Sequence, residues 1–214
     1  MNVHYFNNVG YLTHKFSDNE LKPIRDEIFE IKENFSEYES QKHNQHLAGN
    51  IKREYSLKKC TEVIKNLTYP IVWEFDRQFN YIKSIDLMVK DSPIELSKCW
   101  VNFQKKHEFN PFHTHSGLFS FVVWMKIPAR YDKEKKLPFV DHANCAYPNT
   151  FQLFYTNSSG RICTHDYHLN PEDEGTMLFF TANRGHQVYP FYTSNKTRVS
   201  ISGNIILDVN QVIK

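Results

Sequence analysis

The sequence has little of several features that mark common classes of protein. Only 7 of its 214 residues are glycine, which argues against a parallel α/β sheet with glycine turns. The formal net charge is only +2, so neither nucleic acid nor an anionic membrane is indicated as a partner. No apolar run approaches the roughly 18 residues needed to span a bilayer, and Met1 to Gly10 lacks a basic segment followed by an apolar one. We therefore expect a soluble, cytoplasmic protein.

Cysteine is also scarce, and its spacing is irregular. The chain has no Cys-x-x-Cys pair, and its four cysteines are Cys60, Cys99, Cys145 and Cys163. We interpret them as reduced thiols of an intracellular protein. A structural zinc site formed by Cys145, Cys163 and a nearby histidine is the alternative, but the tight spacing of a zinc knuckle is missing.

Aromatic residues, in contrast, are abundant. They make up 15% of the chain, with 17 Phe and 12 Tyr, which suits a wide, aromatic-lined β interior. From about Asp86 onward, short β-rich runs alternate with turn residues. We predict strands at residues 94–104, 118–128, 150–155, 162–167, 176–181, 185–189 and 197–209. Strands of this number and length predict a mainly β (α+β) protein, a sandwich or jelly roll.

The first part of the chain has mostly helical periodicity. After a short strand within residues 1–15, capping residues from Ser17 begin a helix that runs to about Asn34. The polar residues 35–50 are predicted to form a loop. A second helix covers about residues 57–81, and Pro70 should kink or divide it. We expect a single domain, residues 1–214, in which residues 1–90 brace a β core formed by residues 91–210.

Two histidines just before an apolar strand are the strongest candidates for a functional site. His113 and His115 are two residues apart, and an extended chain directs such side chains to the same face. Neutral imidazole is a common ligand for iron, zinc, copper and nickel, so the pair can hold one metal ion. A surface loop with two solvated histidines is the alternative. The charged insertion at residues 129–148 is predicted to be a solvated loop that could close over this site.

A second group of polar residues lies near the end of the chain. Arg198 follows His186 by 12 residues, which suits two adjacent strands joined by a short turn. His186 can then meet the first histidine pair inside the β interior. Arg198 and Ser200 lie on one strand face and can hold a carboxylate by charge-assisted hydrogen bonds. Three further residues, Trp100, Asn102 and Phe121, are predicted to line the same cavity.

These residues resemble the motifs of the Fe(II)- and 2-oxoglutarate-dependent oxygenases. The resemblance extends from about Trp100 to Asn204 and is carried by His-x-His-Ser-Gly, by His186 with Val-Tyr-Pro, and by Arg198-x-Ser200. It looks closest to small oxygenase-like proteins of phage and bacterial genomes. It implies a double-stranded β-helix, an Fe(2+) ion, 2-oxoglutarate as cosubstrate and O2. It also implies that His113, His115 and His186 bind the metal, and that the cosubstrate is held by Arg198, Ser200 and Asn102.

The sequence departs from the usual pattern of this superfamily at one position. His115 stands where His-x-Asp or His-x-Glu would place a carboxylate. Three explanations are open. His115 is itself a ligand, or a water molecule completes the ligand set and His115 does not contact the metal, or the remote Asp141 coordinates. We expect an oxygenase, of hydroxylase type. A three-His dioxygenase that does not use 2-oxoglutarate and a non-catalytic binding module are the alternatives. The substrate stays open between a protein side chain, a nucleobase and a small metabolite, and an oligomer is compatible with the sequence.

Overall fold

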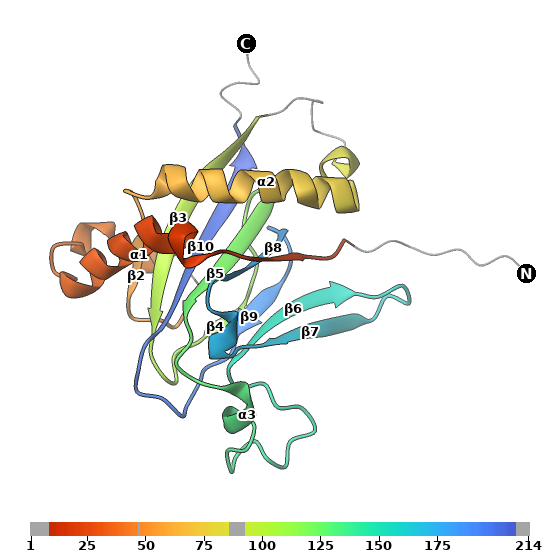
Figure 1. Ribbon diagram of the computed structural model, residues 1–214. Coiled ribbons are helices and arrows are strands. Elements are labelled where there is room, and N and C mark those ends of the chain that lie inside the picture. Colours follow the sequence, from red (N-terminus) through yellow and green to blue (C-terminus); the bar gives the residue numbers. More distant parts are fainter. Residues whose placement is uncertain (1–8, 47, 86–92, 209–214) are drawn as a thin grey trace, which may run out of the picture.

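The computed structural model describes residues 9–46, 48–85 and 93–208, and in this part of the chain two antiparallel β-sheets face each other (Figure 1). The larger sheet has the strand order β1 (Leu12–Lys15), β8 (Thr176–Thr181), β5 (Phe119–Lys126), β10 (Arg198–Leu207), β3 (Ile94–Gln104) and β2 (Glu54–Ser56). The smaller sheet has the order β4 (Asn110–His113), β9 (His186–Val188), β6 (Thr150–Thr156) and β7 (Ile162–His168). The prediction of a mainly β, jelly-roll fold is confirmed.

The larger sheet is buried on both faces. Strand β5 shows this directly, because seven of its eight residues are buried. Side chains on one face, such as Val123 and Ile201, join the core beneath the helices. Side chains on the other face, such as Val122 and Trp124, pack with Phe151 and Leu153 of the smaller sheet. Apolar side chains therefore line part of the space between the two sheets, and polar groups can be held in fixed positions among them.

Two helices cover the outer face of the larger sheet (Figure 1). Helix α1 (Asp18–Glu33) begins after Ser17, whose hydroxyl accepts from the Glu20 N–H at 3.3 Å while the Glu20 carboxylate accepts from the Ser17 N–H at 2.7 Å. This capping box confirms the predicted start. Helix α2 (Thr61–Phe79) continues through Pro70, so a division of the helix there is wrong. Pro70 and Asn66 are both exposed, and water can hydrate the Asn66 carbonyl that proline leaves without a donor.

A buried carboxylate connects the two helices. Glu27 of α1 is 3% exposed, and it accepts hydrogen bonds from the backbone N–H groups of Lys58, Lys59 and Cys60 at 2.8, 3.0 and 2.8 Å. These groups lie immediately before α2, where a helix leaves donors unsatisfied and favours negative charge. Glu27 therefore caps α2 from a neighbouring element.

The connecting segments contain short helical turns. The predicted loop at residues 35–50 holds the 3-10 turns Glu39–Gln41 and Asn44–His46, and two more turns lie at Ile82–Ser84 and Pro171–Asp173. The insertion at residues 129–148 contains the short helix α3 (Tyr131–Glu134). Its Glu134 is fully buried and accepts from the backbone N–H groups of Tyr192 and Thr193. The start of this insertion is thus tied to the segment between β9 and β10.

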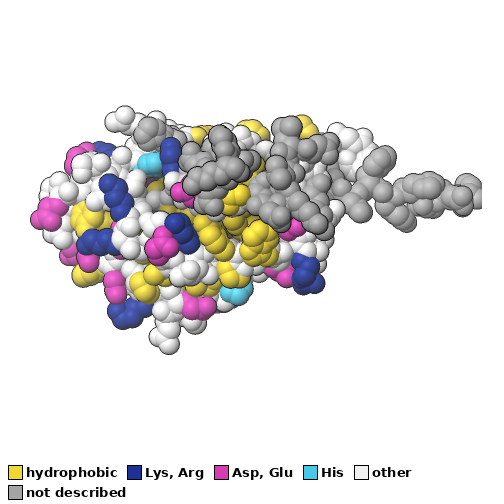
Figure 2. Space-filling view, turned by 90° about the horizontal axis from the view of Figure 1, so that it is seen from above, with side chains coloured by type: hydrophobic (Ala, Val, Ile, Leu, Met, Phe, Trp, Pro, Cys, Tyr) yellow, Lys and Arg dark blue, Asp and Glu magenta, His cyan; other side chains and the backbone are white. Residues whose placement is uncertain are grey.

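The described side chains on the face above α2 carry charges of both signs (Figure 2). Seen from above α2, basic and acidic side chains are interspersed among hydrophobic ones (Figure 2), in keeping with the small net charge of +2. Within the described residues, no helix combines the length and the apolar character that crossing a bilayer would require.

Candidate metal centre

The three histidines singled out from the sequence come together between the sheets. Potential ligand atoms of His113, His115 and His186 all lie within 4.8 Å of one another. His113 ends β4 and His186 begins β9, and the two residues are direct partners in the register of these strands. Directly opposed residues place their side chains on one face of a sheet. His115 follows in the loop, where its backbone N–H donates to the Ala182 carbonyl at 2.8 Å. The predicted convergence is confirmed.

The local backbone orients two of the three imidazoles. Nδ1 of His113 lies 2.7 Å from the Pro111 carbonyl, and Nδ1 of His186 lies 2.8 Å from the Arg184 carbonyl. A carbonyl only accepts, so in each ring Nδ1–H is the donor and Nε2 keeps its lone pair. Histidines that bind metals are commonly held in this way by a second hydrogen bond.

Burial keeps the three imidazoles in the form that binds metals. It lowers the pKa of His186 well below its ordinary value, with His113 as a further cause. Burial also lowers the pKa of His113. For His115, burial and then the neighbouring His113 lower the pKa to about 4. At neutral pH all three rings are therefore uncharged, with a lone pair available for a cation.

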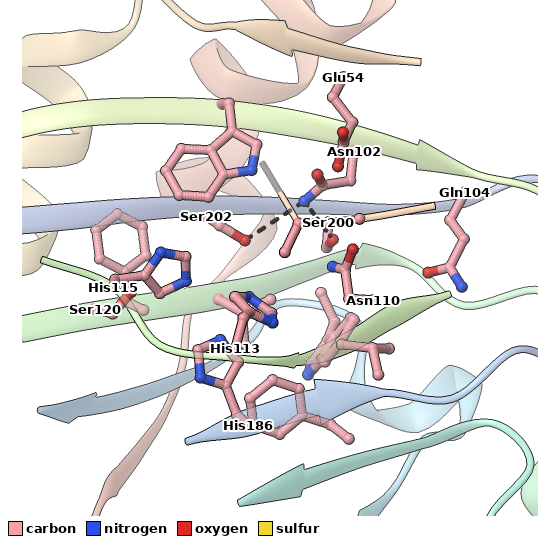
Figure 3. Close-up of a pocket in the computed structure, with 18 of the residues that line it drawn as sticks. Glu54, Asn102, Gln104, Asn110, His113, His115, Ser120, His186, Ser200 and Ser202 are labelled. Atoms are coloured by element: carbon pink, nitrogen blue, oxygen red, sulfur yellow. Dashed lines mark hydrogen bonds between the residues drawn. The ribbon is translucent and has the colours of Figure 1, made fainter. Parts of the chain in front are cut away.

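A row of polar side chains on the larger sheet forms one wall of the pocket beside the histidines (Figure 3). Glu54, Asn102, Ser200 and Trp124 are in register across β2, β3, β10 and β5. All four line the pocket, and we call them the polar row. The Asn102 amide donates to the Ser200 hydroxyl at 3.2 Å. The predicted residues Asn102, Ser200, Trp100 and Phe121 are thus all pocket-lining residues.

Arg198 precedes Ser200 by two residues on β10 and lies beside this wall, where it is 1% exposed and does not line the pocket. Its Nε donates to Gln104 Oε1 at 3.1 Å, Nη1 to Asn149 Oδ1 at 2.8 Å and Nη2 to the Tyr189 carbonyl at 2.9 Å. All three acceptors are neutral, and burial lowers the pKa of Arg198 to about 9. The guanidinium is thus fixed in position without an ion pair in the described part of the chain, although the buried carboxylate of Glu134 partly opposes the lowering of its pKa.

One expectation about strand pairing is wrong. His186 and Arg198 do not lie on adjacent strands, because β9 belongs to the smaller sheet and β10 to the larger one. The segment between them crosses from one sheet to the other, so the two residues approach the pocket from opposite walls. A spacing of 12 residues fits a hairpin and a crossing between sheets equally well.

Three buried polar atoms in the pocket wall have no hydrogen-bond partner. They are Trp124 Nε1, Asn102 Oδ1 and Asn110 Oδ1, and their residues all line the pocket beside the histidines. Buried polar groups are almost always paired, since an unpaired one costs about 1–3 kcal/mol. Several such atoms around one pocket indicate a place where a ligand supplies the missing partners.

Comparison with known proteins places this site in a family. A family model of 2OG-Fe(II) oxygenases matches residues 98–204, half of the chain. The chain belongs to this 2OG-Fe(II) oxygenase family. All three histidines and both Arg198 and Ser200 lie within the matched segment. The family uses Fe(II), 2-oxoglutarate and O2, and the cluster of His113, His115 and His186 can hold the iron.

Solved oxygenase structures share the fold. A prolyl-4-hydroxylase from Pseudomonas putida is 10% identical, with 92% of each chain covered and a TM-score of 0.53. An oxidoreductase of the 2OG-Fe(II) oxygenase family from Burkholderia pseudomallei is 13% identical, with 92% of this chain and 84% of that chain covered and a TM-score of 0.52. The epimerase SnoN of nogalamycin biosynthesis is 13% identical over 92% of this chain and 77% of that chain, with a TM-score of 0.52. No curated protein sequence matches the chain.

The residues of this oxygenase fit the two groups that the family uses. Three neutral imidazoles around one point suit a ferrous ion. Trp124 Nε1, an unpartnered donor, and the Ser200 hydroxyl lie in the polar row, and the guanidinium carbon of Arg198 is 5.9 Å from the centre of the Trp124 ring. Donors beside a positive charge that forms no ion pair suit a carboxylate such as that of 2-oxoglutarate.

The pocket of this oxygenase also contains residues that sequence reasoning missed, and it lacks others that were expected. Ala48, Gly49 and Glu54 line it, although they lie outside the segment that matches the family. No periodicity marks them, because β2 is three residues long. Asp141 is exposed and lies outside the histidine cluster. The insertion at residues 129–148 contributes no lining residue to this pocket, whereas Ala48 and Gly49 do.

Proposed function

We propose that this oxygenase is an Fe(II)- and 2-oxoglutarate-dependent hydroxylase. The observation that carries the proposal is the position of the three-histidine cluster beside the polar row, with a buried arginine next to that row on β10. A metal ligand set and a carboxylate site thus share one pocket. When bound, iron supplies the chemistry by which O2 and 2-oxoglutarate oxidise a C–H bond, with succinate and CO2 as by-products.

In this proposal the metal is held by His113, His115 and His186. Because each ring is neutral, the ligand set carries no negative charge, unlike a set with one carboxylate. His115 is the ligand that replaces the usual acid, and its fixed backbone and its packing 5.8 Å from Trp100, measured between ring centres, hold it beside the other two.

The carboxylate of 2-oxoglutarate that is remote from the metal is bound at the end of the pocket near Arg198. The three hydrogen bonds to neutral acceptors fix the guanidinium, and its charge stabilises the carboxylate through the low dielectric of the interior. Ser200 supplies its hydroxyl, and Asn102 holds that hydroxyl in position by donating an amide N–H to it. Trp124 Nε1 gains the acceptor that it otherwise lacks.

A two-step thermal-shift titration tests the function. We expect Mn(II), as an unreactive substitute for Fe(II), to raise the unfolding temperature, and 2-oxoglutarate to raise it further only when the metal is present. His186→Ala should lose both effects and should also lose succinate formation with Fe(II). The control is His142→Ala, because His142 is exposed and lies outside the cluster. Unchanged turnover of His186→Ala would refute the assignment.

A second candidate function follows from the missing carboxylate ligand. The described residues place no Asp or Glu in the histidine cluster, and three-His centres suit dioxygenases that do not use a keto acid. Stabilisation by metal without any response to 2-oxoglutarate would favour this function over the first.

We also propose a cytoplasmic location. All four cysteines are free thiols, and such thiols persist in reducing compartments. Fractionation of the native host would test this, and recovery of the protein with a disulfide from an oxidising compartment would contradict it.

A further inference from the structure

The end of the polar row farthest from Trp124 is formed by Glu54. This residue is 1% exposed, and its carboxylate accepts from the Asn44 amide at 3.1 Å. No Lys, Arg or His among the described residues forms an ion pair with it. A carboxylate has about four lone-pair positions, so most of its capacity to accept hydrogen bonds is unused. Burial, with Glu108 as a lesser cause, raises the pKa of Glu54 to about 8. A buried acid without a cation is costly to keep.

Two more unused acceptors lie beside Glu54. Asn102 is its direct partner in the β2–β3 register, and both Asn102 Oδ1 and Asn110 Oδ1 are buried without a donor. A Cβ at Gly49 would meet Asn110 Oδ1 at 2.1 Å and Glu54 Oε1 at 3.0 Å. The Gly49 backbone therefore lies against both oxygens, and the absence of a side chain there lets them approach the same point.

The two ends of the pocket have opposite character. Near Trp124 the unpaired atom is a donor and the buried Arg198 is a cation, whereas near Glu54 the unpaired atoms are acceptors and the ionisable group is an acid. A carboxylate bound at the Glu54 end would meet unpaired acceptors and no cation of the described residues. Figure 3 shows Asn110 between Glu54 and the histidines, so a group bound at this end would extend toward the metal centre.

We propose that Glu54, Asn102 and Asn110 bind a cationic nitrogen group of the substrate, a primary ammonium or a guanidinium. The inference rests on the proposed function in one respect. The oxidised carbon is taken to belong to the part of the substrate that extends from the cationic group toward the histidines. An ammonium has three N–H donors, and the pocket offers one carboxylate and two amide oxygens to receive them. The positive charge would also compensate the buried acid. Glu54 is thus a specificity-determining residue that lies outside the segment shared with the family.

Calorimetric titration with small probes tests the inference. We expect n-butylamine and n-butylguanidine to bind the Mn(II)-loaded protein with 2-oxoglutarate present, and n-butanol and butyrate to bind at least 10-fold more weakly. Glu54→Gln keeps the shape of the side chain and its contact with Asn44, but it should weaken amine binding at least 10-fold. The matched control Glu95→Gln removes an exposed acid on β3 and should leave binding unchanged. Free lysine and an N-acetyl-lysine amide then distinguish a small amine from a side chain within a polypeptide.

A second variant keeps the inference testable if Glu54→Gln does not fold. Asn110→Asp adds a negative charge beside Glu54 and should tighten amine binding. Equal amine affinity in wild type and Glu54→Gln, or a preference for butyrate, would overturn the inference.

Titrations of wild type and Glu54→Gln with the metal and with 2-oxoglutarate separate the two proposals. If 2-oxoglutarate fails to bind wild type while amine binding still depends on Glu54, the hydroxylase function fails and the cation site stands. If 2-oxoglutarate binds but amines do not, the function stands and the cation site fails.

Discussion

Single buried polar residues set the character of this pocket. Glu54 and Arg198 are each 1% exposed, yet neither forms an ion pair in the described residues. Buried ionisable groups without ion pairs reduce stability and are found where function requires them. Two predictions at the scale of the residue follow from this arrangement.

The first concerns the pH dependence of stability through Glu54. Its ordinary pKa of 4.5 rises to about 8 in the folded protein, so between these values the folded state keeps a proton that the unfolded chain releases. Proton release by the unfolded chain lowers the stability of the folded protein across this range. The stability is fully present below the lower pKa, and its loss is complete once pH has risen through the upper one. Glu54→Gln cannot ionise, so its unfolding temperature should rise relative to wild type as pH increases from about 5 to about 9. Thermal unfolding across this range checks the prediction, with Glu95→Gln as control. Parallel profiles for wild type and Glu54→Gln would contradict it.

The second concerns the geometry of Arg198. Arg198→Lys keeps the charge, but one ammonium cannot reach all of Gln104, Asn149 and the Tyr189 carbonyl in the positions that the guanidinium occupies. We expect a loss of about 2–4 kcal/mol in the free energy of unfolding, measured with urea. Arg198→Met should also weaken 2-oxoglutarate binding more than Arg198→Lys does, because it removes the charge. The exposed Arg161, changed to lysine, is the control. A 2-oxoglutarate affinity that is the same in Arg198→Met and wild type would show that the charge has no role.

At the scale of the element, the helices show how local signals and distant contacts combine. The capping box at Ser17 and the apolar spacing of Leu21, Ile24, Ile28 and Ile31 predict α1 from the sequence alone, and all four of these side chains are buried. Helix α2 has no side-chain cap of its own at Cys60. Its start depends on Glu27, which comes from α1.

Removal of Glu27 should therefore destabilise the contact between the two helices. Glu27→Ala leaves three backbone N–H groups without an acceptor, and we expect a loss of about 2–4 kcal/mol in the free energy of unfolding. Urea denaturation followed by circular dichroism measures this loss. Glu33→Ala, at an exposed position of the same helix, should change stability by no more than about 0.5 kcal/mol. Equal stabilities of the two variants would show that Glu27 does not cap α2.

At the scale of the whole molecule, we propose that the helices and the β core form one cooperative unit. One hydrophobic cluster joins residues of α1, α2, β3, β5, β8 and β10. If the unit is single, separation of the helices from the sheet exposes one apolar face of that sheet.

Equilibrium unfolding tests whether the helices and the β core unfold together. In a Trp73→Phe variant, whose remaining Trp100 and Trp124 lie in the larger sheet, ellipticity at 222 nm and tryptophan fluorescence should change at one urea concentration. A fragment that begins at residue 93 should aggregate. Two separate transitions, or a soluble folded fragment, would instead show two domains.

The sequence by itself determined the elements and the chemistry that they carry. Runs of apolar and β-branched residues predicted β3 and β8 to the residue, and the spacing of His113 and His115 predicted a shared direction. The motifs around His186 and Arg198 indicated an oxygenase. These features are local, because side-chain alternation and metal-ligand spacing depend only on neighbours in the chain.

Only the tertiary structure decided which residues meet. Strands β4 and β2 are four and three residues long, too short for any periodicity, and both are fixed by pairing with strands distant in the chain. The pairing of β4 with β9 places His113 opposite His186, and the pairing of β2 with β3 places Glu54 beside Asn102. Register between distant strands depends on packing and hydrogen bonds that no local pattern contains. The cation site at Glu54 is for that reason a product of the fold.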